Sequence, residues 1–208
     1  MALDNTTDKD LGEKYYEIFS ENKRNIILVI LFLLVIYFGA IFYKESNKES
    51  MLIASDLYQK VQIAENLNEV EGIVKKLKND YKETAYASRA IIFLGNLYMK
   101  DKKYEDAISN YIWSSNHAKE TAIKSLSHYQ LALNYYLIGD YNSAMKESLE
   151  IDEQGFKGLK YYLKGDIHVK LNQTNEAIKS FKQAYDFYSD KNDLARVIKT
   201  KIDAIGPN

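Results

Sequence analysis

The feature that most constrains this chain is an uncharged, apolar stretch near its amino terminus, from Ile26 to Tyr43. Fourteen of its eighteen residues are isoleucine, leucine, valine or phenylalanine. At about −0.3 to −0.6 kcal/mol each on an insertion scale, they favour a bilayer by roughly 4–8 kcal/mol. Together with Asn25 they would form a helix about 28 Å long, close to the thickness of a hydrocarbon core. The sequence therefore predicts a transmembrane helix over residues 25–43, with Ile26, Leu34 and Tyr43 inside the bilayer.

Two other interpretations of this stretch fit its residues less well. A buried core helix is usually shorter and carries polar residues on one face. A cleaved signal peptide needs small residues at the end of its apolar region. This stretch instead ends in Ile41, Phe42 and Tyr43 and continues directly into Lys44. We therefore expect an uncleaved signal anchor that crosses the membrane once.

The residues on either side of the span indicate an orientation. Lys14, Lys23 and Arg24 precede the span, whereas Lys44 and Lys48 follow it. This small excess of basic residues favours a cytoplasmic amino terminus. Within the tail, residues 1–24, we expect the polar stretch 1–11 to be loose. The cluster Tyr15, Tyr16, Ile18 and Phe19 predicts a short amphipathic helix at the membrane surface.

The composition of the remaining chain favours one all-helical domain. Residues 44–208 are numerous enough to bury a core. The single proline is Pro207, and the chain has nine glycines and no cysteine, which excludes disulfides and Cys-ligated zinc. The whole chain carries 28 basic and 29 acidic residues, so it has no strong positive electrostatic field that would attract nucleic acid.

From Tyr86 onward the chain repeats a pattern of one bulky, one small and one aromatic position, followed by an alanine and a second bulky position. Its three copies are Leu94, Gly95, Tyr98, Ala107 and Tyr111; Leu131, Ala132, Tyr135, Ala144 and Ser148; and Lys164, Gly165, His168, Ala177 and Phe181. The offsets between copies are 37 and 33 residues. A period near 34 residues with this pattern is typical of tetratricopeptide repeats, which are hairpins of two helices.

Physical requirements explain the residue types in the pattern. The small residue lets the first helix of a hairpin approach the second, and the alanine lies at the same crossing. The aromatic residues fill the space between adjacent hairpins. Met51 to Asp80 reads as a degenerate first hairpin, and Asp193 to Ile205 as a terminal capping helix. The predicted fold is therefore all-α, with one transmembrane helix followed by an α-solenoid of helical hairpins and a C-terminal cap.

The order of these features resembles the YfgM family, the ancillary SecYEG translocon subunit of Gram-negative bacteria. The resemblance extends from Leu11 to Ile205. The residues that carry it are Phe19 and Lys23 before the anchor; Tyr81, Ala85, Tyr86 and Ala87; the turn Gln154-Gly155-Phe156; and Lys164-Gly165-Asp166. It implies an inner-membrane protein with its repeat domain, residues 44–208, in the periplasm. It also implies association with the SecYEG channel and with a periplasmic chaperone of the PpiD type, and it brings no catalytic residues.

The side chains that could carry chemistry do not form a catalytic or metal-binding pattern. The three histidines, His117, His128 and His168, are not spaced as metal ligands on one helix. His168 occupies the position of Tyr98 and Tyr135 in the other repeats, which predicts a packed core histidine. We expect no cofactor and no enzymatic activity.

One row of residues is a candidate binding surface, because the first helices of such hairpins line the concave face. The row consists of Ile92, Asn96 and Met99; Tyr129, Leu133 and Tyr136; and Tyr162, Asp166 and Val169. It is mostly apolar and aromatic, which suits an unfolded or secreted polypeptide. The alternative is that the C-terminal helix or the first hairpin of the same chain fills it.

The expected function is a membrane-anchored scaffold that binds other proteins at the secretion channel. Two alternatives remain open at the level of the sequence. One is a repeat scaffold for another envelope machine, such as outer-membrane assembly or division. The other is an accessory subunit of an enzyme whose catalytic chain is a different protein.

Overall fold

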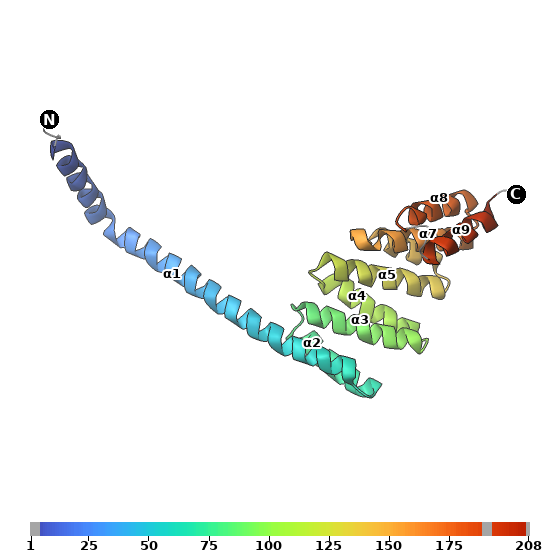
Figure 1. The fold of residues 1–208 in the computed structure, drawn as a ribbon. Helices are drawn as coiled ribbons and strands as arrows, with labels where there is room; N and C mark the ends of the chain where they lie inside the picture. Colours follow the sequence, from blue (N-terminus) through green and yellow to red (C-terminus); the bar gives the residue numbers. More distant parts are fainter. Residues whose placement is uncertain (1–4, 189–192, 207–208) are drawn as a thin grey trace. The chain divides into compact units, whose positions relative to one another are not determined.

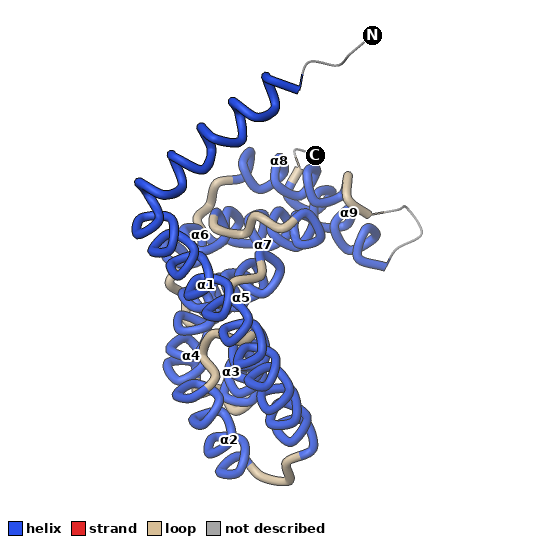
Figure 2. Tube along the Cα trace, turned by 90° about the vertical axis from the view of Figure 1, so that its left-hand side faces the viewer, coloured by secondary structure: helices blue, strands red, loops and turns tan. Residues whose placement is uncertain are grey.

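The computed structural model describes residues 5–188 and 193–206. It divides into two compact units, Met1–Glu49 and Ser50–Asn208, and the boundary lies within the first helix, α1 (Asn5–Ile63). All regular structure in the described ranges is helical (Figure 2). The predicted all-α fold class is therefore confirmed.

Helix α1 is longer than the sequence suggested. It begins at Asn5, so the expected loose stretch 1–11 is helical from residue 5 onward, and residues 1–4 lie outside the described range. The amphipathic segment is not a separate helix, because residues 5–26 contain no proline and a single glycine, Gly12, and one glycine costs a helix only about 1 kcal/mol. Tyr16 and Phe19 are exposed, whereas the side chains of Tyr15 and Ile18 lie outside the described residues.

The first unit contains the candidate membrane span. Between Asn22 and Ile63, α1 holds a segment long and apolar enough to cross a bilayer, and none of that segment is buried against protein. Leu34 and Tyr43 are exposed and Ile26 is partly exposed. No contact with described residues of the chain therefore accounts for the apolar composition of this segment.

The second unit is a stack of antiparallel helices (Figure 1). After the end of α1 come α2 (Leu67–Asp80), α3 (Ala85–Lys100), α4 (Tyr104–His117), α5 (Thr121–Leu137), α6 (Tyr141–Leu149), the 3-10 helix η1 (Gln154–Phe156), α7 (Lys157–Lys170), α8 (Thr174–Tyr185) and α9 (Asp193–Ile205). The pairs α3/α4, α5/α6 and α7/α8 are the three predicted repeats. The end of α1 shares a core with α2, and α9 packs on α8 as a cap.

The turn inside each repeat has the same backbone geometry. Lys102, Gly139 and Asn172 occupy equivalent positions just beyond α3, α5 and α7, and their φ angles are 60°, 85° and 57°. A left-handed residue at this position ends a helix by closing hydrogen bonds to its last carbonyls. The next helix can then begin within two residues, which makes the hairpin tight.

The predicted helix crossings are confirmed by burial and by a match of side-chain volumes. Ala107, Ala144 and Ala177 are fully buried. A methyl group added at Gly95 would lie 2.6 Å from the Tyr111 ring. A methyl group at the equivalent Gly165 would collide with the Phe181 ring. In the middle repeat the equivalent pair is Ala132 and Ser148, so a larger residue on the first helix accompanies a smaller one on the second.

This arrangement predicts opposite effects of one substitution at two glycines. Gly165→Ala should destabilise the chain by about 1–2 kcal/mol, because the buried Phe181 ring must shift to admit the methyl group. Gly72→Ala lies within α2, where nothing approaches the added methyl group within 4 Å. It should stabilise by about 0.5–1 kcal/mol through helix propensity. Thermal unfolding of the full chain in detergent, followed by the helical circular dichroism signal, measures both; equal shifts would contradict the packing.

Candidate functional site

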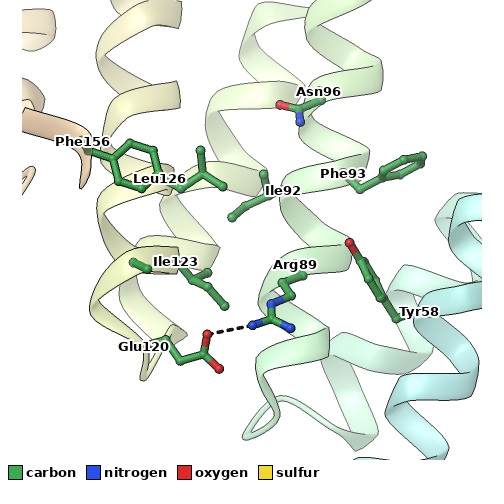
Figure 3. A pocket seen from close by; sticks show the side chains of 10 residues that line it. Tyr58, Arg89, Ile92, Phe93, Asn96, Glu120, Ile123, Leu126 and Phe156 are labelled. Atoms are coloured by element: carbon green, nitrogen blue, oxygen red, sulfur yellow. Dashed lines mark hydrogen bonds and ion pairs between the residues drawn. The ribbon is translucent and has the colours of Figure 1, made fainter. Parts of the chain in front are cut away.

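A groove of about 410 Å³ lies between the end of α1, α3 and α5 (Figure 3). We call it the α3–α5 groove. Most of its wall is apolar or aromatic: Tyr58, Ile92, Phe93, Ala122, Ile123, Leu126 and Phe156, with Arg89, Asn96 and Glu120 as the polar members. All of these residues belong to the second unit. Two members of the predicted row, Ile92 and Asn96, therefore lie in a concave site.

The two charged residues of the groove neutralise each other. The Arg89 guanidinium donates to the Glu120 carboxylate at 2.9 Å, and both side chains are about half exposed (Figure 3). The guanidinium also lies 5.7 Å from the centre of the Tyr86 ring. Because Arg89 belongs to α3 and Glu120 immediately precedes α5, the pair joins the two helices at one end of the groove. The groove carries no net charge.

Asn96 gives the groove a directed polar group. Its Oδ1 atom accepts a hydrogen bond from the Tyr111 hydroxyl at 2.6 Å. Tyr111 is fully buried in α4, and this burial raises the pKa of its hydroxyl. Tyr111 therefore holds the carbonyl side of the Asn96 amide. The amide nitrogen of Asn96 has no acceptor among the described residues, and its side chain is exposed at the groove wall.

Hydrogen bonds between buried serines hold α3, α4 and α5 together behind the groove. The Ser127 hydroxyl donates to Ser114 Oγ at 2.8 Å, and Ser114 Oγ lies 3.4 Å from the Ser88 carbonyl oxygen. These three residues lie on α5, α4 and α3 and are almost completely buried. Such small side chains let the three helices approach closely, and this fixes the spacing between α3 and α5.

Phe156 reaches the groove from a segment outside the repeat pattern, the connection 150–156 between α6 and α7. Ser125 Oγ accepts hydrogen bonds from the backbone N–H groups of Asp152 and Glu153, at 3.1 and 2.9 Å. Lys160 Nζ donates to the carbonyl oxygens of Leu149 and Ile151, at 3.1 and 2.8 Å. Burial and then the nearby Lys164 lower the pKa of Lys160. The first part of the connection is therefore held on α5 and α7, and η1, which follows it, presents Phe156 beside Leu126 (Figure 3).

The middle of the predicted row is half-buried against neighbouring helices. Tyr129, Leu133 and Tyr136 pack around the buried residues Ala132, Ala144, Leu163 and Ile167. The Tyr136 ring lies 5.7 Å from the Tyr141 ring. Burial raises the pKa of both Tyr129 and Tyr136. These three residues contribute to the contact between the second and third repeats, and their exposed edges lie on one face of α5.

The third part of the row is partly covered by the C-terminal helix. Lys201 of α9 forms an ion pair with Asp166, and its ammonium lies 4.6 Å from the centre of the Tyr162 ring. Burial opposes the charge of Lys201, but its hydrogen bonds to Asp166 and Tyr162 outweigh burial and raise its pKa. The Tyr188 side chain lies against Gly158. The self-filling expected as an alternative for the row thus occurs around Tyr162.

The nine residues of the row therefore do not form one continuous open site. Met99, at the end of α3, contacts the buried Asn134 amide of α5 at 3.2 Å. Val169, at the end of α7, is exposed. Sequence reasoning missed Tyr58, Phe93, Leu126 and Phe156 as groove residues. Among these residues, only Phe156 had a signal in the sequence, because it ends the turn Gln154-Gly155-Phe156 that precedes the last repeat.

The histidines have packing and hydrogen-bonding roles. His117 stacks on Trp113 with ring centres 4.0 Å apart, and His128 contacts Glu147 at 2.8 Å. His168 was predicted to be a core residue, and this was wrong. It is only partly buried, and it lies in the last turn of α7, where its ring reaches Gln173, 2.6 Å away. No group of three potential metal ligands occurs among the described residues.

Comparison with known proteins agrees with the fold. The profile of the family described as tetratricopeptide repeat-like domain matches residues 17–207. The chain belongs to this family. The prediction of tetratricopeptide-like hairpins is thereby confirmed, and the matched range also includes the apolar helix. As in the structure, the match extends through α9 rather than ending at the third repeat.

Individual relatives support the resemblance that the sequence motifs indicated. An ancillary SecYEG translocon subunit of Buchnera aphidicola (subsp. Acyrthosiphon pisum) is 27% identical over 193 residues, which cover 88% of this chain and 96% of the relative. A protein of the same name from Neisseria gonorrhoeae is 20% identical over 159 residues, covering 76% of each chain. The resemblance predicted from the sequence motifs is confirmed, since these similar proteins carry the name of that family.

Solved structures support the architecture alone. A protein of nearly identical TPR-like repeats from Podosopora anserina superposes with a TM-score of 0.57, at 13% identity, over 76% of this chain and 84% of that one. At such low identity the likeness concerns the fold. The repeat fold and the names of the relatives together point to a scaffold for protein interactions without catalysis of its own.

Proposed function

We propose that this chain is a non-catalytic, membrane-anchored scaffold that serves as an ancillary subunit of the SecYEG translocon. The observation that carries the proposal is the extent of the match to the Buchnera aphidicola relative of that name, which covers 96% of the relative's length. The match therefore includes both the apolar helix and the repeats. Such a subunit needs two parts. One is a membrane span that can lie beside the channel, and the other is a repeat domain that can bind proteins.

The proposed partners follow from these two parts. The span, residues 25–43 with Ile26, Leu34 and Tyr43, would contact the lipid bilayer and the SecYEG channel. The repeat domain would bind secreted polypeptides and a membrane-anchored periplasmic chaperone of the PpiD type, and would assist the transfer of one to the other. The candidate contact residues are Ile92, Met99, Tyr129, Leu133, Tyr136, Tyr162 and Val169.

Purification of the complex tests the main proposal. The tagged full chain, extracted from inner membranes in mild detergent, should retain the channel subunits through several washes. A matched chain whose span is replaced by an unrelated apolar helix of equal length separates retention through the anchor from retention through the repeats. Recovery of subunits of an outer-membrane assembly or division complex, without channel subunits, would instead favour the alternative scaffold.

The proposed topology places residues 1–24 in the cytoplasm and residues 44–208 in the periplasm of a bacterial cell. The basic residues Lys14, Lys23 and Arg24 before the span support this orientation. Protease added to spheroplasts should remove the repeat domain and spare a tag at the amino terminus. The same protease added to inverted vesicles is the control and should remove the tag. Repeats that remain intact in spheroplasts would refute the orientation.

A further inference from the structure

We propose that one end of the repeat domain binds the anionic headgroups of the bilayer through a basic surface around Trp113. This surface, which we call the Trp113 edge, comes from the last turns of α2 and α4 and from the segments that follow them. Its members are Lys75, Lys78, Lys82, Trp113, His117 and Lys119. The inference rests on the proposed membrane anchoring and is independent of the assignment to the translocon.

The chain itself would bring one end of the second unit close to the bilayer. α1 is one continuous helix, and only residues 44–49 separate the proposed span from Ser50, where the second unit begins. From Tyr43 to Ser50 the helix rises by about 10 Å. This distance is comparable with the Debye length of about 8 Å at physiological ionic strength. Charges near Ser50 would therefore be within range of the headgroups in any orientation of the unit.

The Trp113 edge lies at the same end of the second unit as Ser50. α2 has 14 residues, as many as α1 has from Ser50 to Ile63, and the two antiparallel helices share a core. The last turn of α2 therefore lies beside the part of α1 near Ser50. Lys78 in this part of α2 reaches α4, where its ammonium lies 5.5 Å from the centre of the Trp113 ring. Leu52, an exposed apolar residue, belongs to the same end.

Cations outnumber acids on this part of the surface. Residues 75–83 and Lys119 together include five lysines and two acidic residues. Lys119 is paired with Glu83 at 2.6 Å, whereas the three lysines of the edge on and after α2 form no ion pair with a described residue. Lys119, and after it Lys82 and His117, lower the pKa of Glu83, so this carboxylate lies among cations. The complement of such a surface is a layer of phosphate groups.

Trp113 suits a headgroup contact because its ring is held at the surface. The ring packs against the buried cluster of α1, α2 and α3 and is partly exposed. The His117 ring stacks on it with centres 4.0 Å apart. Tryptophan is enriched at the headgroup level of membranes, where an apolar ring with a polar edge suits both neighbouring phases. A tryptophan surrounded by lysines thus has the composition of a surface that lies on a membrane.

The contact would restrict rotation of the repeat domain about its anchor. A single helix attaches the domain at one point, and the Trp113 edge would supply a second attachment beside it. No residue that lines the α3–α5 groove belongs to the Trp113 edge, so a headgroup bound at the edge leaves the groove unoccupied. The same side of the domain would then always face away from the bilayer.

Fluorescence of Trp113 tests the contact directly, because it is the only tryptophan in the sequence. The full chain is reconstituted in vesicles of phosphatidylcholine, with or without phosphatidylglycerol, in which some lipids carry a nitroxide quencher on the headgroup. We expect quenching in the presence of phosphatidylglycerol to be about threefold that in phosphatidylcholine alone. Added salt should reduce this difference by screening the charges.

Lys75→Gln combined with Lys82→Gln removes two cations and leaves Lys78, which contacts the ring, in place. At about fivefold per lysine, the equilibrium constant of the contact should fall about 30-fold. Quenching should therefore decrease to the level seen in phosphatidylcholine. The variant in phosphatidylcholine vesicles supplies its own baseline, which corrects for any direct effect on the fluorescence of Trp113.

Lys179→Gln combined with Lys182→Gln is the matched control, because it makes the same change of charge at two exposed lysines of α8. It should leave the quenching unchanged. Quenching that does not depend on phosphatidylglycerol would overturn the inference. So would equal losses in the two double variants, since the position of the lysines would then be irrelevant.

The outcome is separable from that of the proposed function. If channel subunits copurify with the chain but phosphatidylglycerol does not increase the quenching of Trp113, only the headgroup contact fails. If Trp113 is quenched as expected but no channel subunits copurify, only the assignment to the translocon fails. A chain that alkaline carbonate removes from the vesicles is not anchored by a span, and then the proposed anchoring and this inference fail together.

Discussion

Replacing Phe181 with alanine should cost the repeat domain about 3–5 kcal/mol, the usual cost of removing a buried aromatic ring. Phe181 has no exposed surface, and it fills the space above Gly165 at the crossing of α7 and α8. Its ring also lies 6.0 Å from the Tyr162 ring and belongs to the cluster that holds Ile198 of α9. The substitution therefore removes both the central side chain of the last repeat and part of the surface on which the capping helix α9 packs.

The loss should be confined to one end of the domain. Stability in repeat arrays is approximately a sum of unit and neighbour terms, so the far repeats need not unfold with the last one. Hydrogen exchange of the full chain in detergent should show faster exchange in α7, α8 and α9 and little change in α2 and α3. Phe187→Ala, at a partly exposed ring, is the control and should change exchange only locally. Uniformly faster exchange would contradict independent units.

Ala144→Leu should destabilise the middle repeat by about 2–3 kcal/mol through overpacking. Ala144 has no exposed surface and lies at the crossing of α5 and α6, beside Ala132 and Leu163. A leucine there must displace a helix or force strained rotamers. Thermal unfolding of the full chain in detergent should show the loss as a lower midpoint.

Lys146→Leu, two residues away in the same helix, supplies the control. Lys146 is exposed, so the same new side chain meets solvent instead of a helix. It should shift the unfolding midpoint little. Similar losses from the two substitutions would mean that the alanine does not mark the crossing.

The repeat architecture could be predicted because each of its physical requirements falls on a fixed position. Ala107, Ala144 and Ala177 recur at a constant distance from the small residue of the preceding helix, and all three are buried as the spacing requires. The capping helix could also be predicted from the sequence, since the predicted range Asp193–Ile205 is the observed α9. Local periodicity carries such information because each crossing involves two helices that are adjacent in sequence.

The candidate site was less predictable, because its parts come from segments that are distant in sequence. Tyr58 and Phe156 lie almost a hundred residues apart, and no pattern links them. The pairing of Lys201 with Asp166 depends on how α9 docks on the last repeat, which its amphipathic pattern does not specify. His168 is partly buried, as Tyr98 and Tyr135 are at the equivalent positions, so the repeat pattern marks this position but does not make it a core position.

The matched volumes at the three crossings also restrict how this domain could be recombined. A glycine faces an aromatic ring in the first and third repeats, whereas alanine and serine occupy the equivalent positions in the second. Exchanging α5 for α7 alone would leave a void opposite Ser148 and a collision opposite Phe181. Exchanging both helices of a hairpin would keep each pair intact. The hairpin, and not the single helix, is thus the smallest segment that duplication or laboratory shuffling could move without a second compensating change.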